Sequence, residues 1–432
     1  MTEKTISRRR LLGASLKAAA TFTIVPRYVL GSASYIPPSE NITRGVIGTG
    51  SMGIGAHVFE NKPGKAPLTL AVCDVDENHL AEAMRKAARG CDAYRDFRRV
   101  LERKDIDVIH VATPPHWHAL ITIAAAQAGK DVLCEKPMHR FIREGQAVID
   151  ALNRYGRVFQ IGTYNRFGGF EHVGWSPRLR KICRSGILGK PLTVRITGAM
   201  GFEWKVQRHS GIPNPTLEAA PKELDYNMWL GPAPWKPYHR HRVHGSFRGY
   251  WDYDGGGLTD MGQHFLDPVQ YFLDKDHTSP VEIEAEAPWP VHPDAVGVWG
   301  RIVMKYEDGD TIILESGEWG TPREAPDAPL IEGPKGRIYP QNRTDPPGLF
   351  ELLDKFPEEP RLIPFYNQAI KERKQAGGNA EVSHRSTILL HIANIAIRTG
   401  RKLRFDPITQ TFPGDDEANR LIDVPMRAPW HL

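Results

Sequence analysis

The pattern of hydrophobic and polar positions divides the chain into two parts. From Arg44 to about Gln160, short apolar runs alternate with amphipathic segments. This alternation is typical of parallel strands joined by right-handed helical crossovers. The expected strands are 45–47, 68–73, 108–112, 132–134 and 158–161, and the expected helices are 77–88, 119–128 and 143–155.

After Thr163 the pattern changes, because residues 164–261 are rich in Trp, Pro, Gly and His. Further on, apolar and polar residues alternate in three runs, which is the pattern of antiparallel strands with one solvated face. The chain is therefore predicted to be an α/β protein whose second domain, 164–432, has a mainly antiparallel sheet. Its expected strands are 192–197, 281–287, 296–306 and 311–316, its helices 177–185, 365–374 and 381–399, with a hairpin turn at 307–310 and a long loop at 320–360.

The composition is that of a globular protein. The chain has 432 residues, of which 41% are hydrophobic and 25% charged, so it can bury a sizeable core. This excludes disorder, collagen and coiled coil as descriptions of the whole chain. Since no stretch of about 18 uncharged apolar residues exists, a membrane-spanning helix is excluded as well.

The positive net charge of +5 is concentrated at the N-terminus. Residues 1–33 carry six basic side chains and one acidic side chain, and the remaining chain has equal numbers of each. Proteins that bind nucleic acid need a basic surplus or a basic face. We therefore expect no nucleic-acid partner.

Residues 1–33 are predicted to be a signal peptide, followed by a linker at 34–43. The run from Ser7 to Leu12 contains the twin-arginine pattern, a weakly apolar stretch follows, and small residues allow cleavage after Ala33. This pathway exports folded proteins, typically with a cofactor already loaded, so a periplasmic or secreted location is expected. A disordered basic tail or an uncleaved anchor is the alternative.

The cysteines give no sign of a metal or redox motif. The four of them show no CxxC or zinc-type spacing. We expect buried free thiols, and the sequence leaves a disulfide open.

A glycine-rich turn follows the first expected strand and opens a helix, which is the context in which GxGxxG binds a dinucleotide. The first glycine makes the turn, the second admits the pyrophosphate, and the third packs helix on strand. The pyrophosphate would lie at the helix N-terminus. The expected cofactor-binding residues of this turn are Gly48, Gly50, Ser51, Met52 and Gly53.

Asp74 ends the second expected strand. A carboxylate at this position binds the ribose hydroxyls and repels a 2′-phosphate. Asp76 adds a second negative charge, and no Arg follows at once. The sequence therefore predicts NAD, rather than NADP, as cofactor.

Two further strands end in polar motifs that should face the nicotinamide. Ligands of such sheets bind at the carboxyl ends of the strands. Lys136 there would stabilise the oxyanion that develops when a hydroxyl is oxidised, with a solvated Glu135–Lys136 pair as the alternative. The expected cofactor contacts of these motifs are Thr113, Pro114, His118 and Glu135.

Asp260 and His264 follow a run of three glycines, and His264 is four positions after Asp260. If a helix begins here, the two side chains share one face. A neutral imidazole can take a hydroxyl proton, and the carboxylate can orient it or bind substrate. The alternative is a capping aspartate with a structural histidine.

Other histidines and aromatic residues are weaker candidates. His239 and His241 with His244, or His116 with His118, have ligand chemistry, but no Cys, Asp or Glu spacing completes a site, and no metal is expected. Four aromatic side chains are candidates to stack on a sugar, with core packing as the alternative for each: Trp229, Trp235, Tyr250 and Trp251.

Together these motifs resemble the family of glucose–fructose oxidoreductase and inositol 2-dehydrogenase (Gfo/Idh/MocA). The resemblance implies a Rossmann domain at 44–163 and an α/β domain with a large open sheet that often forms the oligomer interface, so a homodimer or homotetramer is expected. It implies catalytic roles for Lys136, Asp260 and His264. It places substrate contacts at Tyr164, Asn165 and Arg166, and the segment around Trp251 is similar to exported members.

The sequence therefore predicts an NAD-dependent oxidoreductase that acts on a sugar or polyol hydroxyl and holds its cofactor tightly. Because the cofactor carries the hydride chemistry, the protein supplies the geometry. One alternative is an NAD-dependent glycoside hydrolase that works by transient oxidation and elimination. Another is a non-catalytic NAD-binding protein.

Overall fold

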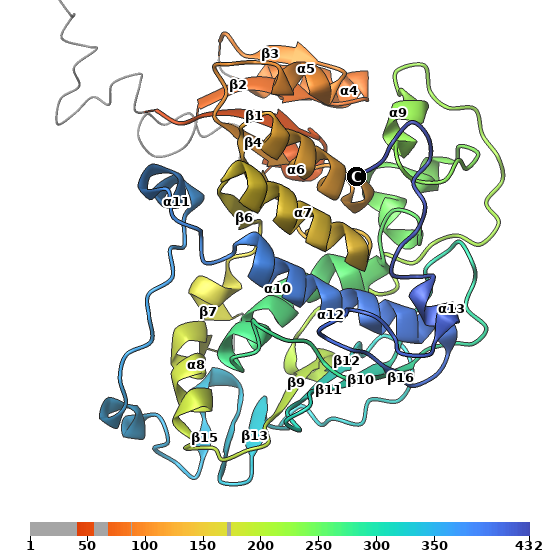
Figure 1. Ribbon diagram of the computed structural model, residues 1–432. Coiled ribbons are helices and arrows are strands. Elements are labelled where there is room, and N and C mark those ends of the chain that lie inside the picture. Colours follow the sequence, from red (N-terminus) through yellow and green to blue (C-terminus); the bar gives the residue numbers. More distant parts are fainter. Residues whose placement is uncertain (1–40, 56–67, 88, 171–173) are drawn as a thin grey trace, which may run out of the picture.

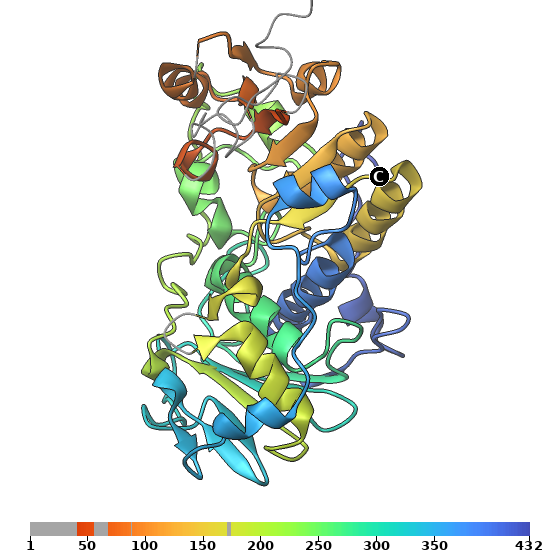
Figure 2. The ribbon, with the colours of Figure 1, turned by 90° about the vertical axis from the view of Figure 1, so that its left-hand side faces the viewer.

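The computed structural model describes residues 41–55, 68–87, 89–170 and 174–432, and these contain two large sheets with helices packed on and between them (Figure 1). The predicted signal peptide and most of the predicted linker lie outside the described residues. Turning the molecule by 90° shows the first sheet at one end and the second at the other (Figure 2).

The N-terminal sheet has six parallel strands in the order β3-β2-β1-β4-β5-β6. The strands β4 and β5 are buried throughout, as their apolar runs predict. The order reverses between β1 and β4, and this switch point is where sheets of this kind bind ligands. The strands are β1 Thr43–Ile47, β2 Leu68–Cys73, β3 Asp92–Tyr94, β4 Val108–Val111, β5 Asp131–Cys134 and β6 Phe159–Ile161.

The helices of this domain begin and end where local signals place them. Asp76 accepts a hydrogen bond from the backbone N–H of Asn78 and caps α4. Gly156 ends α7 in the left-handed conformation with φ 60°. The helices are α3 Ser51–Gly55, α4 Glu77–Lys86, α5 Phe97–Leu101, α6 His118–Gln127 and α7 Ile142–Tyr155.

The second sheet has eight strands in the order β15-β14-β13-β9-β12-β11-β10-β16. Its pairings are antiparallel except for the parallel pair β9–β12. The predicted mainly antiparallel sheet is therefore confirmed. The strands are β9 Thr193–Thr197, β10 Glu282–Glu286, β11 Arg301–Lys305, β12 Thr311–Glu315, β13 Ile331–Gly333, β14 Gly336–Ile338, β15 Thr344–Asp345 and β16 Leu403–Arg404, with a separate hairpin of β7 Gly169–Phe170 and β8 Gly174–Trp175.

The expectation of a long loop at 320–360 is wrong. This region forms β13, β14 and β15, which extend the sheet beyond β9. The strands have only two or three residues each, too few for an alternating pattern to show in the sequence. Their place in the sheet is fixed by the hydrogen bonds between β13 and β9, a contact between distant parts of the chain.

The helices α10 and α12 join the two domains (Figure 1). They pack against each other, and α12 also contacts α7 of the first domain and β10 of the second. Ser386 of α12 accepts a hydrogen bond from Gln263 of α10 at 2.6 Å. The helices of this part are α8 Ser176–Ser185, α9 Tyr226–Leu230, α10 Gly256–Phe272, α11 Tyr366–Glu372, α12 Ala380–Thr399 and α13 Asp416–Asn419.

Residues 201–254, the returning segment, run from the second domain back to the first, where α9 lies beside the N-terminal sheet (Figure 1). The backbone N–H of Asp225 donates to the carbonyl of Val75 at 3.0 Å, and Trp117 donates its indole N–H to the carbonyl of Trp229 at 3.0 Å. The segment therefore closes over the carboxyl ends of the first sheet. Short 3-10 helices are η2 Pro115–Trp117, η3 Asn165–Phe167, η4 Gly198–Met200, η5 Arg240–Arg242, η6 His244–Gly249, η7 Pro340–Asn342 and η8 Glu351–Lys355.

All four cysteines are free and buried, as the sequence predicts. Among the described residues, no helix has the length and the hydrophobicity needed to cross a membrane.

Candidate active site

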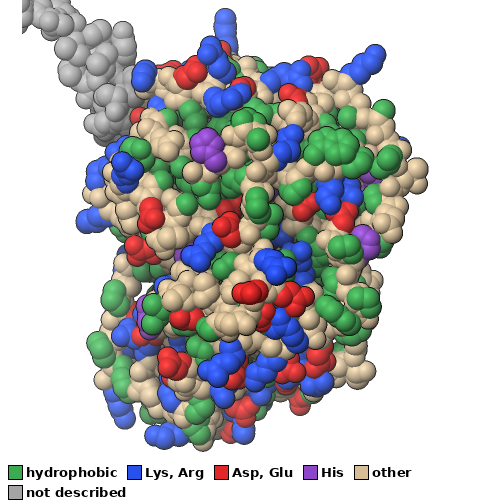
Figure 3. All heavy atoms as spheres, turned by 45° about the vertical axis from the view of Figure 1, so that its right-hand side comes forward, with side chains coloured by type: hydrophobic (Ala, Val, Ile, Leu, Met, Phe, Trp, Pro, Cys, Tyr) green, Lys and Arg blue, Asp and Glu red, His purple; other side chains and the backbone are tan. Residues whose placement is uncertain are grey.

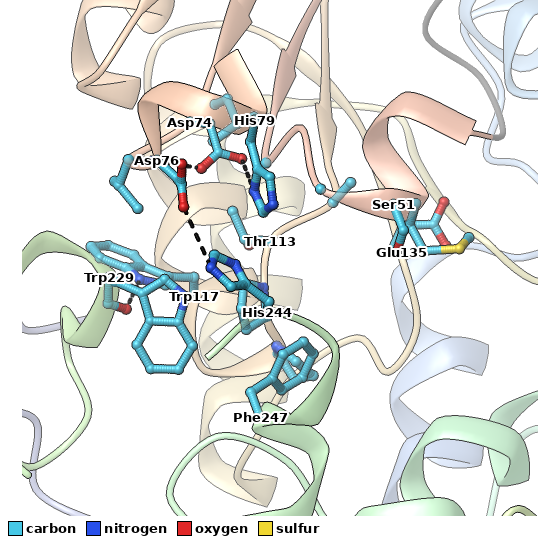
Figure 4. A pocket seen from close by; sticks show the side chains of 18 of the residues that line it. Ser51, Asp74, Asp76, His79, Thr113, Trp117, Glu135, Trp229, His244 and Phe247 are labelled. Carbon is cyan, nitrogen blue, oxygen red and sulfur yellow. Dashed lines mark hydrogen bonds and ion pairs between the residues drawn. The ribbon is translucent and has the colours of Figure 1, made fainter. Parts of the chain in front are cut away.

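A cavity lies at the carboxyl ends of the parallel strands, between the Rossmann domain and the returning segment (Figure 4). The first wall comes from the glycine loop after β1 and from the ends of β2, β4 and β5. The opposite wall comes from α9, η6 and the start of α10. Residues far apart in the sequence thus face one another across this space.

The glycine loop has the backbone that a dinucleotide site needs. Gly48 has φ 89°, and a Cβ there would lie 2.6 Å from the backbone of Thr113. A Cβ on Gly53 would lie 1.9 Å from the carbonyl oxygen of Gly48, so Gly53 packs the helix on the turn rather than lining the cavity. Gly50, Ser51 and Met52 line the cavity, where a phosphate can approach the backbone.

Asp74 lies at the rim of the same cavity and is held by the glycine loop. Its Oδ2 accepts a hydrogen bond from the backbone N–H of Thr49 at 2.7 Å, and its Oδ1 accepts one from the N–H of Asp76 at 2.9 Å. His79 lies beside it, with Nδ1 3.6 Å from Oδ2. The interaction with Asp74 raises the pKa of His79 against the opposing effect of burial.

Of the residues predicted to contact the nicotinamide, Thr113, Pro114 and Glu135 line the cavity. His118 does not, and this is a correction: its side chain is 1% exposed. Its ring nitrogens lie 2.7 Å from the carbonyl oxygen of Thr113 and 2.6 Å from that of Pro137. His118 therefore fixes the loops after β4 and β5 relative to each other, a contact that only the folded chain reveals.

Lys136 and Asp260 form the ion pair at the centre of the site. The Lys136 Nζ donates to Oδ1 of Asp260 at 2.6 Å and to its backbone carbonyl at 2.7 Å. Arg248 donates to the same Oδ1 at 2.7 Å, and Nε2 of His209 lies 3.3 Å from Oδ2. Burial alone would raise the pKa of Asp260, but Lys136, His209 and Arg248 together hold it far below its usual range. Asp260 is therefore a carboxylate at neutral pH.

His264 follows Asp260 by one turn of α10, as the spacing predicts. Burial and the neighbouring Lys136 lower the pKa of His264 to about 4, so its imidazole is neutral at pH 7. Its side chain makes no hydrogen bond within the described part of the chain, and it is not among the residues that line the cavity. A base must have a free lone pair, and this one does.

Asp254 is a second carboxyl group in this wall, and the sequence analysis did not single it out. It lines the cavity and is almost completely buried, with Oδ1 accepting a hydrogen bond from the N–H of Gly255 at 2.8 Å. Burial raises the pKa of Asp254 to about 6, with Asp260 adding to the shift and Arg248 opposing it. A carboxyl of this kind can hold a proton near neutral pH.

None of the three predicted substrate contacts of the segment after β6 lines the cavity. Tyr164 is 37% exposed, and Asn165 donates to the backbone carbonyl of His264 at 3.1 Å. Arg166 must be corrected, because it is 1% exposed and paired with Asp267 at 2.7 Å and Asp276 at 3.0 Å. A guanidinium held by two carboxylates in the interior braces α10 and does not contact substrate.

Trp251 also requires a correction, since it is 3% exposed and donates its indole N–H to the carbonyl of His292 at 3.1 Å. It lies outside the cavity, with the guanidinium of Arg398 over its ring. Trp229, Trp117 and Phe247, seen in Figure 4, line the cavity instead, together with Phe97. Single aromatic residues give no sequence signal that separates a core position from a cavity position.

Among the described residues, neither His116 with His118 nor His239 with His241 belongs to a group of three possible metal ligands. His116 lies 3.0 Å from the carbonyl oxygen of Trp229, and His241 lies 3.1 Å from the hydroxyl of Tyr250. His244 faces Asp76, with Nε2 3.4 Å from Oδ2 (Figure 4).

Known proteins show the same two domains. Residues 42–163 match the family GFO_IDH_MocA, described as oxidoreductase family, NAD-binding Rossmann fold. Residues 175–432, more than half of the chain, match GFO_IDH_MocA_C2, the oxidoreductase family C-terminal alpha/beta domain. The chain belongs to the Gfo/Idh/MocA oxidoreductase family.

Curated members of the Gfo/Idh/MocA family are similar to parts of the chain. A levoglucosan dehydrogenase of Pseudarthrobacter phenanthrenivorans is 36% identical over 243 residues, which is 54% of this chain and 52% of that protein. An inositol 2-dehydrogenase of Salmonella typhimurium is 29% identical over 163 residues, 37% of this chain and 46% of that protein. The chain thus spans about half the length of the curated relatives it matches.

Solved structures agree over most of the chain. The aldose-aldose oxidoreductase from Caulobacter crescentus in complex with glycerol has a TM-score of 0.53 at 18% identity and covers 84% of this chain and 100% of that one. The WlbA dehydrogenase from Bordetella pertussis in complex with NADH and UDP-GlcNAcA has a TM-score of 0.57 at 16% identity, covering 85% and 98%. At these identities the likeness shows the fold alone.

Proposed function

We propose that this protein is an NAD-dependent oxidoreductase that oxidises a hydroxyl group of a sugar or polyol. The observation that carries the proposal is the buried Lys136–Asp260 pair, which faces the same cavity as the glycine loop. The relatives named above as levoglucosan and inositol dehydrogenases support the substrate class.

The residues at the cavity rim fit a nicotinamide dinucleotide. The positive φ of Gly48 and the close contact at Gly53 leave a turn against which phosphates can lie, and Asp74 stands where a ribose binds. The carboxylates of Asp74 and Asp76 favour NAD, since a 2′-phosphate would bring like charges together. When bound, the nicotinamide supplies the hydride transfer.

The chain's own residues handle the hydroxyl group. The Lys136 ammonium has a third N–H besides the two that bond Asp260, and this N–H would donate to the substrate oxygen and stabilise its developing negative charge. Asp260, kept charged by three cationic or donor groups, holds Lys136 in place. His264 is neutral above about pH 4 and would accept the hydroxyl proton.

The returning segment shapes the substrate end. Trp229 and Phe247 offer apolar rings, and Arg248 offers a cation, to a ligand lying beside Lys136. Basic and acidic side chains are interspersed on the face shown in Figure 3, which supports a small-molecule substrate rather than a polyanion.

Export, cofactor retention and assembly belong to the same proposal. The twin-arginine pattern in residues 1–33 supports export of a folded, cofactor-loaded protein to the periplasm or beyond. Hydrogen bonds from the returning segment to the Rossmann domain close the cavity, which would slow release of the cofactor. The open sheet of the second domain would serve as the interface of a homodimer or homotetramer.

The experiment uses purified full-length protein, a panel of sugars, polyols and glycosides, and no added nucleotide. Net formation of an oxidised sugar, with a second sugar or an external acceptor reoxidising the cofactor, is the expected result. Hydrolysis without net oxidation would replace the proposal by the glycosidase mechanism. Absence of any conversion, with nucleotide bound, would favour a non-catalytic NAD-binding protein.

A further inference from the structure

Asp76, His79 and His244 gather at the rim of the cavity, away from the Lys136–Asp260 pair. Asp76 precedes α4, His79 lies in its first turn, and His244 begins η6 in the returning segment. Each residue offers one ligand atom, and these atoms lie within 4.8 Å of one another. Figure 4 shows the three side chains converging from the two walls.

The spacing of Asp76 and His244 suits a bound ion better than a direct contact. The Nε2 of His244 lies 3.4 Å from Oδ2 of Asp76, beyond the range of about 2.7–3.2 Å for an N–H···O bond. Bonds of about 2.1 Å to a tetrahedral ion place two ligand atoms about 3.4 Å apart. Asp76 has Oδ2 available for this because Oδ1 caps α4, accepting from Asn78 at 2.8 Å.

The second imidazole lies beside a further carboxylate. The Nδ1 of His79 lies 3.6 Å from Oδ2 of Asp74, an ion-pair distance that is too long for a hydrogen bond, and its Nε2 is left for an ion. A carboxylate beside a ligating imidazole raises its basicity. The His79 and His244 rings lie edge to face with centroids 4.6 Å apart.

The backbone of His244 is a third observation. Its φ is 54°, in the left-handed region that non-glycine residues rarely adopt. Strained residues of this kind persist where the surroundings impose them and cluster at ligand clamps. Here the strain aims the imidazole at Asp76 and His79.

We propose that Asp76, His79 and His244 bind one divalent transition-metal ion of the zinc type. Two imidazoles and a carboxylate suit zinc and its neighbours, whereas magnesium and calcium prefer oxygen ligands alone. The ion would tie the returning segment to the Rossmann domain. Its fourth position would be open to water or to an oxygen of a cavity ligand, because all three residues line the cavity. The ion would lie at the ribose end of the same cavity, beside Asp74, and it would neutralise the charge of Asp76, so that with the ion bound Asp74 alone would disfavour a 2′-phosphate.

The test titrates Zn²⁺ into chelator-treated full-length protein by calorimetry and records the visible spectrum with Co²⁺. We expect one ion per chain, a dissociation constant of about 1 μM or tighter, and the intense absorption of tetrahedral Co²⁺. His79→Ala and His244→Ala should each weaken binding about 10²-fold or more. His241→Ala, in the same segment but outside the cluster, is the matched control and should bind as wild type.

Absence of one-to-one binding, or equal binding by wild type and both cluster variants, would overturn the proposal. A circular dichroism spectrum of each variant checks its fold. If the variants do not fold, histidine modification of the wild type decides. Zn²⁺ should then protect His79 and His244 from diethyl pyrocarbonate and leave exposed His277 reactive, and modification of His79 and His244 regardless of Zn²⁺ would reject the site. These readouts need no enzymatic activity, so they are independent of the proposed function.

Discussion

The two walls of the cavity are built in different ways. The Rossmann wall places Gly48, Asp74, Thr113 and Lys136 at the ends of adjacent parallel strands, so the sheet itself sets their spacing. The opposite wall depends on the returning segment, whose position rests on contacts between distant parts of the chain. The sheet therefore fixes the positions of the residues in the first wall, and the second wall determines the shape of the space that they face.

The second wall also holds two carboxyl groups in opposite states. Asp260 is surrounded by Lys136, Arg248 and His209 and stays charged. Asp254, only six positions earlier, is buried without a comparable set of donors, and its pKa is raised to about 6. Charge at this wall is therefore set by partners from elsewhere in the chain, not by local sequence.

Removing the proposed base should have the largest effect. His264→Ala is expected to lower kcat by about 10²–10⁴-fold, because proton transfer from the hydroxyl loses its acceptor. Nucleotide content, measured after denaturation, should stay the same, and His277→Ala on the surface should be unaffected. A loss below about threefold, with chemistry rate-limiting, would remove His264 from the mechanism.

The Rossmann wall is tested by Lys136→Met, which keeps a long side chain and removes the ammonium. We expect kcat to fall about 10²–10³-fold, the usual cost of losing one oxyanion donor. Lys86→Met, an exposed position on α4, is the control. Retention of more than about a tenth of the activity would show that another group polarises the substrate oxygen.

Asp254→Asn tests the difference between the environments of Asp254 and Asp260 through the pH dependence of the free energy of unfolding. The pKa of Asp254 is higher in the folded state than in the unfolded state. The contribution of this carboxyl to the free energy of unfolding is therefore fully present below about pH 4 and is lost as pH rises through about 6. The asparagine should therefore raise the free energy of unfolding by about 2–3 kcal/mol at pH 8 and change it little at pH 4. Denaturant titrations at the two pH values measure this, and an equal effect at both would refute the buried, proton-holding carboxyl.

The smallest effect is expected at the ribose end. Asp74→Ala should shift the ratio of NAD to NADP affinity toward NADP by about tenfold, or about 1.4 kcal/mol, because one like charge is removed. Equilibrium binding of both nucleotides measures the ratio. Glu102→Gln, an exposed change away from the cavity, should leave it unchanged. An unchanged ratio in Asp74→Ala would mean that Asp74 does not select the cofactor.

The Rossmann half could be predicted because its signals are local. Strands such as β4 and β5 are buried on both faces and appear as apolar runs, and the glycine turn and Asp74 follow their strands directly. The strand β3 escaped prediction because it has three residues and two of them are exposed. The sequence places Lys136 and Asp260 in two separate motifs, and only the folded chain shows their direct contact.

The rest depends on contacts that no short stretch of sequence encodes. The sequence places Arg166 among the substrate contacts, but in the folded chain Asp267 and Asp276 enclose it. Trp251 and Trp229 have the same side chain, yet the first is core and the second lines the cavity. Arg248 reaches Asp260 only because the returning segment folds back on the start of α10.

The most direct test of the central claim follows the bound nucleotide during a single turnover. Purified full-length protein is dialysed, its nucleotide is identified and quantified, and it is mixed rapidly with each sugar or polyol of the panel. The account predicts near-stoichiometric NAD, appearance of the absorbance of the reduced nicotinamide with at least one substrate, and a much slower rise in Lys136→Met and His264→Ala at equal nucleotide content. Bound NADP, no reduction with any substrate, or equal rates in both variants would contradict it.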